Sequence, residues 1–150
     1  IVVNGPGSFT GVRIGVTIAK IYAWACNINV VPISTLKAYA ISNMSYKYYI
    51  SSIDARRNYV YAAIYDSNYN NILDESYINK DDLINKIIKL EDYLIISNTP
   101  ISEFNTVKPK LDIKRIYDYY KNDIGINCHA LKPVYLKEVE AVEKMGGYND

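Results

Sequence analysis

The sequence predicts an α/β fold, and two observations near its start support this prediction. A short apolar strand at 1–3 runs into the glycine turn 5–8 and then into a helix predicted for 10–25. A second apolar strand, predicted for 29–33, leads into a helix that Ser34 caps. Strand, helix, strand and helix in this order are the pattern of a parallel crossover unit.

The second half of the chain predicts a smaller lobe of mixed α/β structure. Three apolar and aromatic runs bounded by turn residues predict an antiparallel meander, at 48–54, 59–66 and 72–77. Asn79 and Asp112 each precede a helical pattern, and a buried strand is predicted at 93–97. We expect the first lobe to cover 1–45 and the second lobe to cover 46–150.

The helix predicted for 10–25 is apolar almost all round. Small residues recur at every fourth position, and we expect this stripe to pack closely on a neighbouring element: Gly11, Gly15, Ala19 and Ala23. A helix this apolar is usually buried on more than one side. We therefore predict a second contact, a partner interface made by Ile14, Thr17, Ile18 and Ile21.

The composition limits the function. Lys and Arg number 17, Asp and Glu number 16, and the formal net charge is +1. This balance gives no electrostatic footprint for independent nucleic-acid binding, so any RNA contact should come through a partner. Cys26 and Cys128 match no CxxC or zinc spacing, and we expect reduced thiols in a cytoplasmic protein. No apolar run reaches about 18 residues, so we expect no membrane span.

The most informative segment is the glycine turn with the start of its helix. It reads Gly5-Pro6-Gly7-Ser8-Phe9-Thr10-Gly11-Val12-Arg13-Ile14-Gly15. A glycine turn at a helix N-terminus can hold an anion, although close packing explains the same glycines. The segment is not a Walker A loop, because no Gly-Lys-Ser/Thr closes it, and it is not a dinucleotide fingerprint.

Two further motifs follow in order. The second reads Asp54-Ala55-Arg56-Arg57-Asn58-Tyr59-Val60-Tyr61, and the third reads Pro133-Val134-Tyr135-Leu136-Lys137 followed by Glu140-Ala141. Together the three motifs resemble the TsaB (YeaZ-like) family, which belongs to the actin-like ATPase superfamily. That family begins with a strand hairpin and a long helix that nothing here matches. Since the chain starts at Ile1 without Met, we expect that preceding sequence is missing.

The resemblance implies an actin-like ATPase (ASKHA, ribonuclease H-like) fold, with an incomplete N-terminal lobe and a smaller mixed α/β lobe. It implies a non-catalytic scaffold that binds TsaD, and TsaE in the full complex, with a homodimer possible when the chain is alone. That complex transfers a threonylcarbamoyl group to the adenosine next to the tRNA anticodon. ATP and metal there belong chiefly to the partners, so we expect this chain to hold no cofactor.

The resemblance points to candidate site residues in two of the motifs. The family-motif loop comprises Gly5, Pro6, Gly7, Ser8, Phe9, Thr10, Gly11 and Arg13. The second motif contributes Asp54, Arg56 and Arg57, which either contact a ligand or partner or simply form a strand-end turn held by hydrogen bonds and an ion pair.

The main alternative is an enzyme. The catalytic paralogue TsaD carries a His-x-x-x-His metal pair after its second strand, where this chain has Thr35 and Tyr39. A glycoprotease-like or nucleotide-hydrolysing enzyme needs a nucleophile with a base or a metal, and His129 is the sole histidine. We therefore expect no catalytic residue and no metal site. A stand-alone nucleotide-binding module is a third hypothesis.

Overall fold

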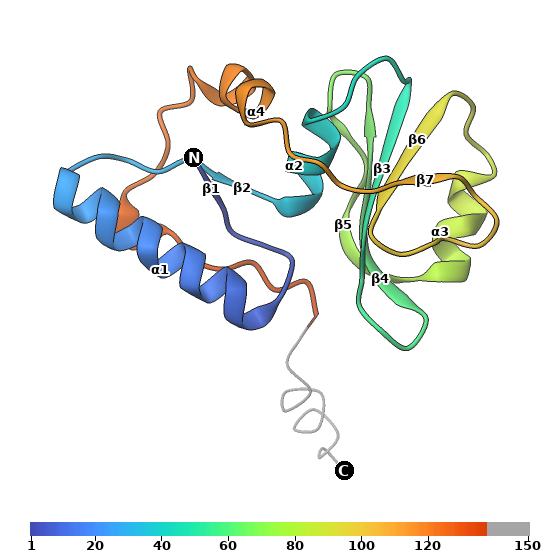
Figure 1. Ribbon diagram of the computed structural model, residues 1–150, viewed down its shortest axis with the longest axis horizontal. Coiled ribbons are helices and arrows are strands. Elements are labelled where there is room, and N and C mark those ends of the chain that lie inside the picture. Colours follow the sequence, from blue (N-terminus) through green and yellow to red (C-terminus); the bar gives the residue numbers. More distant parts are fainter. Residues whose placement is uncertain (138–150) are drawn as a thin grey trace, which may run out of the picture.

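The computed structural model describes residues 1–137, whose strands form two sheets (Figure 1). A two-stranded parallel sheet pairs β1 (Val2–Val3) with β2 (Pro32–Ile33). A five-stranded mixed sheet has the order β5-β4-β3-β6-β7. Its strands, in chain order, are β3 (Tyr48–Asp54), β4 (Tyr59–Asp66), β5 (Asn71–Asn79), β6 (Tyr93–Ser97) and β7 (Thr106–Val107).

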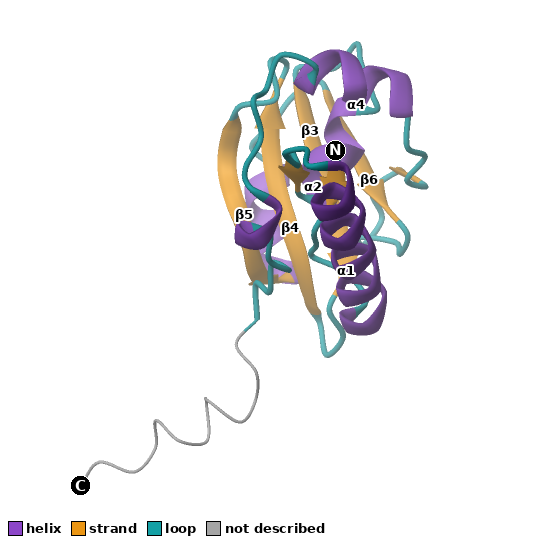
Figure 2. Ribbon diagram, turned by 90° about the vertical axis from the view of Figure 1, so that its left-hand side faces the viewer, coloured by secondary structure: helices purple, strands orange, loops and turns teal. Residues whose placement is uncertain are grey.

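Helices separate and cover these sheets. They are α1 (Phe9–Cys26), α2 (Thr35–Ile41), α3 (Lys80–Ile87), α4 (Ile113–Tyr120) and the 3-10 turn η1 (Cys128–Ala130). Across the molecule, Figure 1 shows α1, the two-stranded sheet, α2, the five-stranded sheet and α3. Figure 2, seen from the α1 side, shows α1 as the outermost layer. The predicted α/β fold class is confirmed.

The predicted helix starts are also confirmed, because each is set by one local hydrogen bond. The Ser34 hydroxyl accepts from the backbone N–H of Lys37 at 3.0 Å, and it caps α2. Asn79 caps α3 and Asp112 caps α4 through side-chain oxygens in the same way. Such caps satisfy N–H groups that have no partner within the helix.

Strand β3 lies at the centre of the five-stranded sheet. It pairs with β4 antiparallel and with β6 parallel, and β4 pairs with β5 antiparallel, which confirms the predicted meander. Successive side chains of a strand point to opposite faces. Tyr49 is buried on the α2 side and Ile50 on the α3 side, so β3 is covered on both faces.

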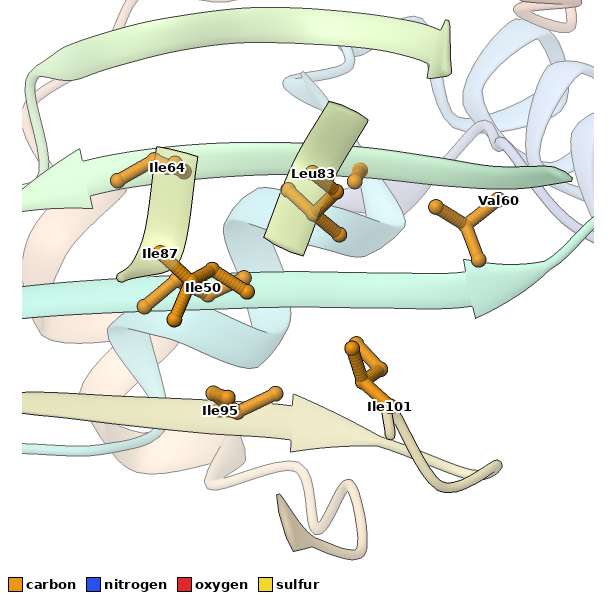
Figure 3. Close-up of a cluster of buried hydrophobic side chains, with 8 residues drawn as sticks. Ile50, Val60, Ile64, Leu83, Ile87, Ile95 and Ile101 are labelled. Carbon is orange, nitrogen blue, oxygen red and sulfur yellow. The ribbon is translucent and has the colours of Figure 1, made fainter. Parts of the chain in front are cut away.

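The largest apolar cluster fills the space between the five-stranded sheet and α3 (Figure 3). Leu83 and Ile87 lie four residues apart on α3 and point into this cluster, as the apolar spacing of the helix predicts. The buried members are Ile50, Val60, Ala62, Ile64, Leu83, Ile87, Ile95 and Ile101. The five-stranded sheet is thus covered by this cluster on one face, and α2 packs on its other face.

The predicted packing of the small-residue stripe of α1 is wrong at two glycines. A Cβ added to Gly15 would meet no atom within 4 Å, and one added to Gly11 would meet only Ser8, at 3.6 Å. The face that packs against the first sheet is instead formed by Val12, Val16, Ala19 and Ala23. Burying branched side chains removes more apolar surface from water than burying glycine does. The helix therefore turns Val12 and Val16 toward the first sheet instead of the two glycines.

The chain after β7 returns to the N-terminal elements. Helix α4 packs on α2, and η1 packs on α1. Val30 and Ile126 form an isolated antiparallel bridge next to the first sheet. The division of the chain at residue 46 stays a prediction. Within residues 1–137, no helix is both long and apolar enough to cross a membrane.

Candidate functional site

The side of α1 that faces away from the first sheet is apolar and open. We call this set the outer face of α1: Ile14, Thr17, Ile18, Ile21 and Tyr22. Ile14 is 54% exposed, Ile18 63% and Ile21 60%. These positions follow helical spacing, so they form one continuous strip. The four residues predicted for a partner interface therefore all point outward, although their contact with a partner stays a prediction.

The glycine turn before α1 is held by hydrogen bonds to β2 and to the start of α2. Asn4 donates its backbone N–H to the carbonyl of Ile33 at 3.0 Å, and the carbonyl of Gly5 accepts from Thr35 at 2.9 Å. Gly5 and Pro6 are buried, and Ser8 caps α1 by accepting from the Gly11 N–H at 3.4 Å. The burial of Gly5 and Pro6 and these hydrogen bonds within the chain support the packing explanation for the start of the turn.

The remaining loop residues lie at the surface where α1 begins. Phe9 is 56% exposed, and the guanidinium carbon of Arg13 lies 5.0 Å from the centroid of its ring. The ring of Tyr135 lies 5.5 Å from the same centroid. Gly7, Ser8, Thr10 and Gly11 are exposed beside them. The contact with Tyr135 was missed at the sequence level, because no local pattern joins positions so far apart.

The second motif forms the tip of the β3–β4 hairpin. Arg56, Arg57 and Asn58 all have positive φ, at 66°, 51° and 62°, a conformation that L residues adopt at a cost. Asp54 pairs with Lys80 at 3.4 Å, and the N–H of Lys80 donates to the carbonyl of Asn58 at 2.9 Å. The start of α3 therefore holds this turn, and both arginines are exposed. A ligand or partner contact for this motif stays a prediction.

A partly buried polar cluster joins α2 to the β4–β5 hairpin. The Glu75 carboxylate accepts from the Ser34 hydroxyl and, at 2.8 Å, from the Tyr65 hydroxyl. The Lys37 ammonium donates to the carbonyl of Tyr69. Burial, and then the Glu75 carboxylate, raise the pKa of Tyr65 far above its ordinary value. Burial lowers the pKa of Lys37, against the attraction of Glu75 and Asp66.

This cluster holds the hairpin to α2. Its hydroxyl, carboxylate and ammonium groups form hydrogen bonds to one another and to the backbone. These bonds account for the cluster as a structural network. No sequence pattern indicates this cluster, because its residues come from three separate elements.

The positions considered for a metal lie apart. Thr35 and Tyr39 are on α2, whereas His129 is on η1 beside α1. Within residues 1–137, no group of three or more His, Cys, Asp or Glu side chains could hold a metal ion. Cys26 is exposed and Cys128 is buried, and both are free thiols.

Comparison with known proteins adds evidence on ancestry. The model of the TsaD family, described as tRNA N6-adenosine threonylcarbamoyltransferase, matches residues 1–130. The chain belongs to the TsaD family. Within that family it resembles proteins named TsaB. It is 47% identical over 66 residues to TsaB of Bacillus subtilis, and 30% identical over 128 residues to TsaB of Buchnera aphidicola.

These TsaB matches cover 43% and 79% of this chain, but only 29% and 57% of the relatives. The chain therefore spans less than two thirds of the length of either. A solved structure of YeaZ from Pseudomonas aeruginosa has the same fold, with a TM-score of 0.69 at 20% sequence identity. That likeness covers 89% of this chain and 71% of the solved one. The TsaB/YeaZ-like assignment and the actin-like fold are confirmed. Of the third motif, Glu140 and Ala141 lie outside the described residues.

Proposed function

We propose that this chain is a non-catalytic scaffold subunit that binds TsaD. In the full assembly it would also adjoin TsaE, and it would support threonylcarbamoyl transfer to the adenosine next to the tRNA anticodon. The relatives named TsaB are tRNA threonylcarbamoyladenosine biosynthesis proteins, which supports a role in that pathway. Because the formal net charge of the chain is only +1, any tRNA contact would come through the partner. The assembly would act in the cytoplasm.

The outer face of α1 is the observation that carries this proposal. Ile14, Ile18 and Ile21 are each more than half exposed on one strip, although α1 also has a buried face toward the first sheet. A contiguous apolar strip of this kind marks an interaction surface. Isoleucine offers no chemistry to a substrate, so the strip favours a binding role over a catalytic one. When TsaD is absent, a second copy would cover the same strip.

Binding to purified cognate TsaD tests the proposal. Ile18→Glu places a charge in the desolvated contact and should weaken binding by at least about 2 kcal/mol, or about 30-fold in Kd. Ile124→Glu is the matched control, because Ile124 is 85% exposed and lies off α1. The control should bind TsaD with the same affinity as the chain without a substitution. If both variants weaken TsaD binding equally, or if neither variant weakens it, the interface lies elsewhere.

A second measurement addresses the enzyme alternative. The chain alone should show no turnover of ATP. When TsaD is added, no side chain of the outer face of α1 should take part in the chemical reaction. ATP hydrolysis by the isolated chain, at a rate that scales with its concentration, would contradict the scaffold proposal.

A further inference from the structure

The segment Leu131–Lys137, which we call the strap, connects the start of α1 to the five-stranded sheet. It follows η1 and begins directly after residue 130, where the match to the TsaD family model ends. In Figure 1 the chain at this point runs past the start of α1 toward the five-stranded sheet. Residues 133–137 of the strap belong to the third motif of the sequence, and the strap lies against the glycine turn.

Three contacts hold the start of the strap to Asn4 and Phe9. Asn4 donates from its side-chain amide to the carbonyl of Lys132 at 3.0 Å, and Val134 donates its N–H to the carbonyl of Asn4 at 2.8 Å. Asn4 is only 8% exposed, and its hydrogen bond to the Lys132 carbonyl is partly buried. Tyr135 then packs on Phe9, the first residue of α1. Buried hydrogen bonds with both partners in place resist opening, because either partner alone would be left unsatisfied.

Two contacts hold the other end to the five-stranded sheet. Leu136 packs against the cluster on the α2 side of the five-stranded sheet, which includes Tyr65 and Ile96. The Lys137 ammonium lies 5.4 Å from the centroid of the Tyr77 ring on β5. The strap therefore spans from the start of α1 to the five-stranded sheet.

We infer that the strap is the positioning element of the partner surface. It fixes the first turn of α1 relative to the five-stranded sheet, and it adds Tyr135 to the surface that continues from Phe9 onto the outer face of α1. Tyr135 is 47% exposed even while it contacts Phe9, so part of its ring is open to a partner. Tyrosine and phenylalanine with a neighbouring arginine are enriched in interface centres. This inference rests on the proposed binding of TsaD.

Asn4→Asp tests the strap, because a carboxylate of the same shape cannot donate to the Lys132 carbonyl. Amide hydrogen exchange should become faster at Val134 and at Val12, by about tenfold for a lost hydrogen bond, and exchange within β3 should be unchanged. Binding to TsaD should weaken by about the same factor. Asn29→Asp is the matched control, because Asn29 donates to the carbonyl of Ile124 at 3.2 Å beyond the far end of α1. The control should change neither readout.

Tyr135 supplies an independent variant that leaves the buried hydrogen bonds in place. Tyr135→Ala should weaken TsaD binding, and Tyr135→Phe should restore it, because the ring makes the contact. Unchanged binding in Asn4→Asp, with faster exchange at Val134, would overturn the positioning role and leave the proposed function intact. Unchanged exchange at Val12 would show that the strap does not hold α1 and would also overturn it. If the unchanged chain does not bind TsaD, the proposed function fails, and the exchange data still show whether the strap holds α1.

Discussion

The backbone carbonyl oxygen of Val134 lies 2.7 Å from the position that a Cβ atom would take on Gly5. Gly5 also has a φ of +112°, which L side chains rarely adopt. Two separate conditions thus require glycine at this position of the motif. At Gly15, ten residues later in the same motif, neither condition applies.

Gly5→Ala should lower the free energy of unfolding by about 1–3 kcal/mol, through backbone strain and the clash with Val134. Gly15→Ala is the control in the same motif. It should raise the free energy of unfolding by up to about 1 kcal/mol, because alanine has the higher helix propensity and its methyl group meets open space. Urea unfolding of both variants measures the difference. A Gly5→Ala chain as stable as the unchanged one would show that Val134 moves freely away.

The elements that the sequence predicted well are those with local causes. Strands β3, β4 and β6 have the predicted bounds, since alternation and turn residues define them within a few positions. The caps Ser34, Asn79 and Asp112 each act on a residue two or three positions further on. In contrast, β7 is only two residues long and has no periodic pattern to detect.

The relationships that the sequence did not predict are long-range or ambiguous. Asn4 and Lys132 are 128 positions apart, and nothing near either residue indicates their hydrogen bond. The orientation of α1 was predicted incorrectly because the helix is apolar on opposite sides. Periodicity alone could not decide whether the glycines or Val12 and Val16 face the sheet.

Alkaline pH should destabilise the fold through Tyr65, which is buried, and Tyr120, which is partly buried. Burial raises the pKa of Tyr120 to about 12, from an ordinary value of 10.0, and burial also raises the pKa of Tyr65. In the unfolded chain these hydroxyls lose their protons near pH 10. The stabilisation is therefore fully present below about pH 10, and for Tyr120 it is lost as the pH rises to about 12.

Urea unfolding between about pH 9 and 12 measures this loss. Tyr120→Phe has no hydroxyl to ionise, so its stability should fall less steeply with pH than that of the unchanged chain. Parallel curves for the two proteins would show that Tyr120 ionises equally in the folded and unfolded states.

The open position of Gly15 predicts an effect on binding that is separate from stability. Gly15 lies on α1 next to the outer face, and within residues 1–137 a Cβ there would meet no atom within 4 Å apart from its chain neighbours and the backbone of its own helix. Gly15→Leu should therefore leave the free energy of unfolding unchanged or raise it by up to about 1 kcal/mol. A neighbouring helix that packs closely over glycine has no room for leucine, so TsaD binding should weaken by about 1–3 kcal/mol. Calorimetric titration with TsaD and urea unfolding of the same preparation give both quantities. A stable variant with unchanged affinity would show that the partner does not approach α1 at Gly15, and a destabilised variant would show that Gly15 is packed within the chain.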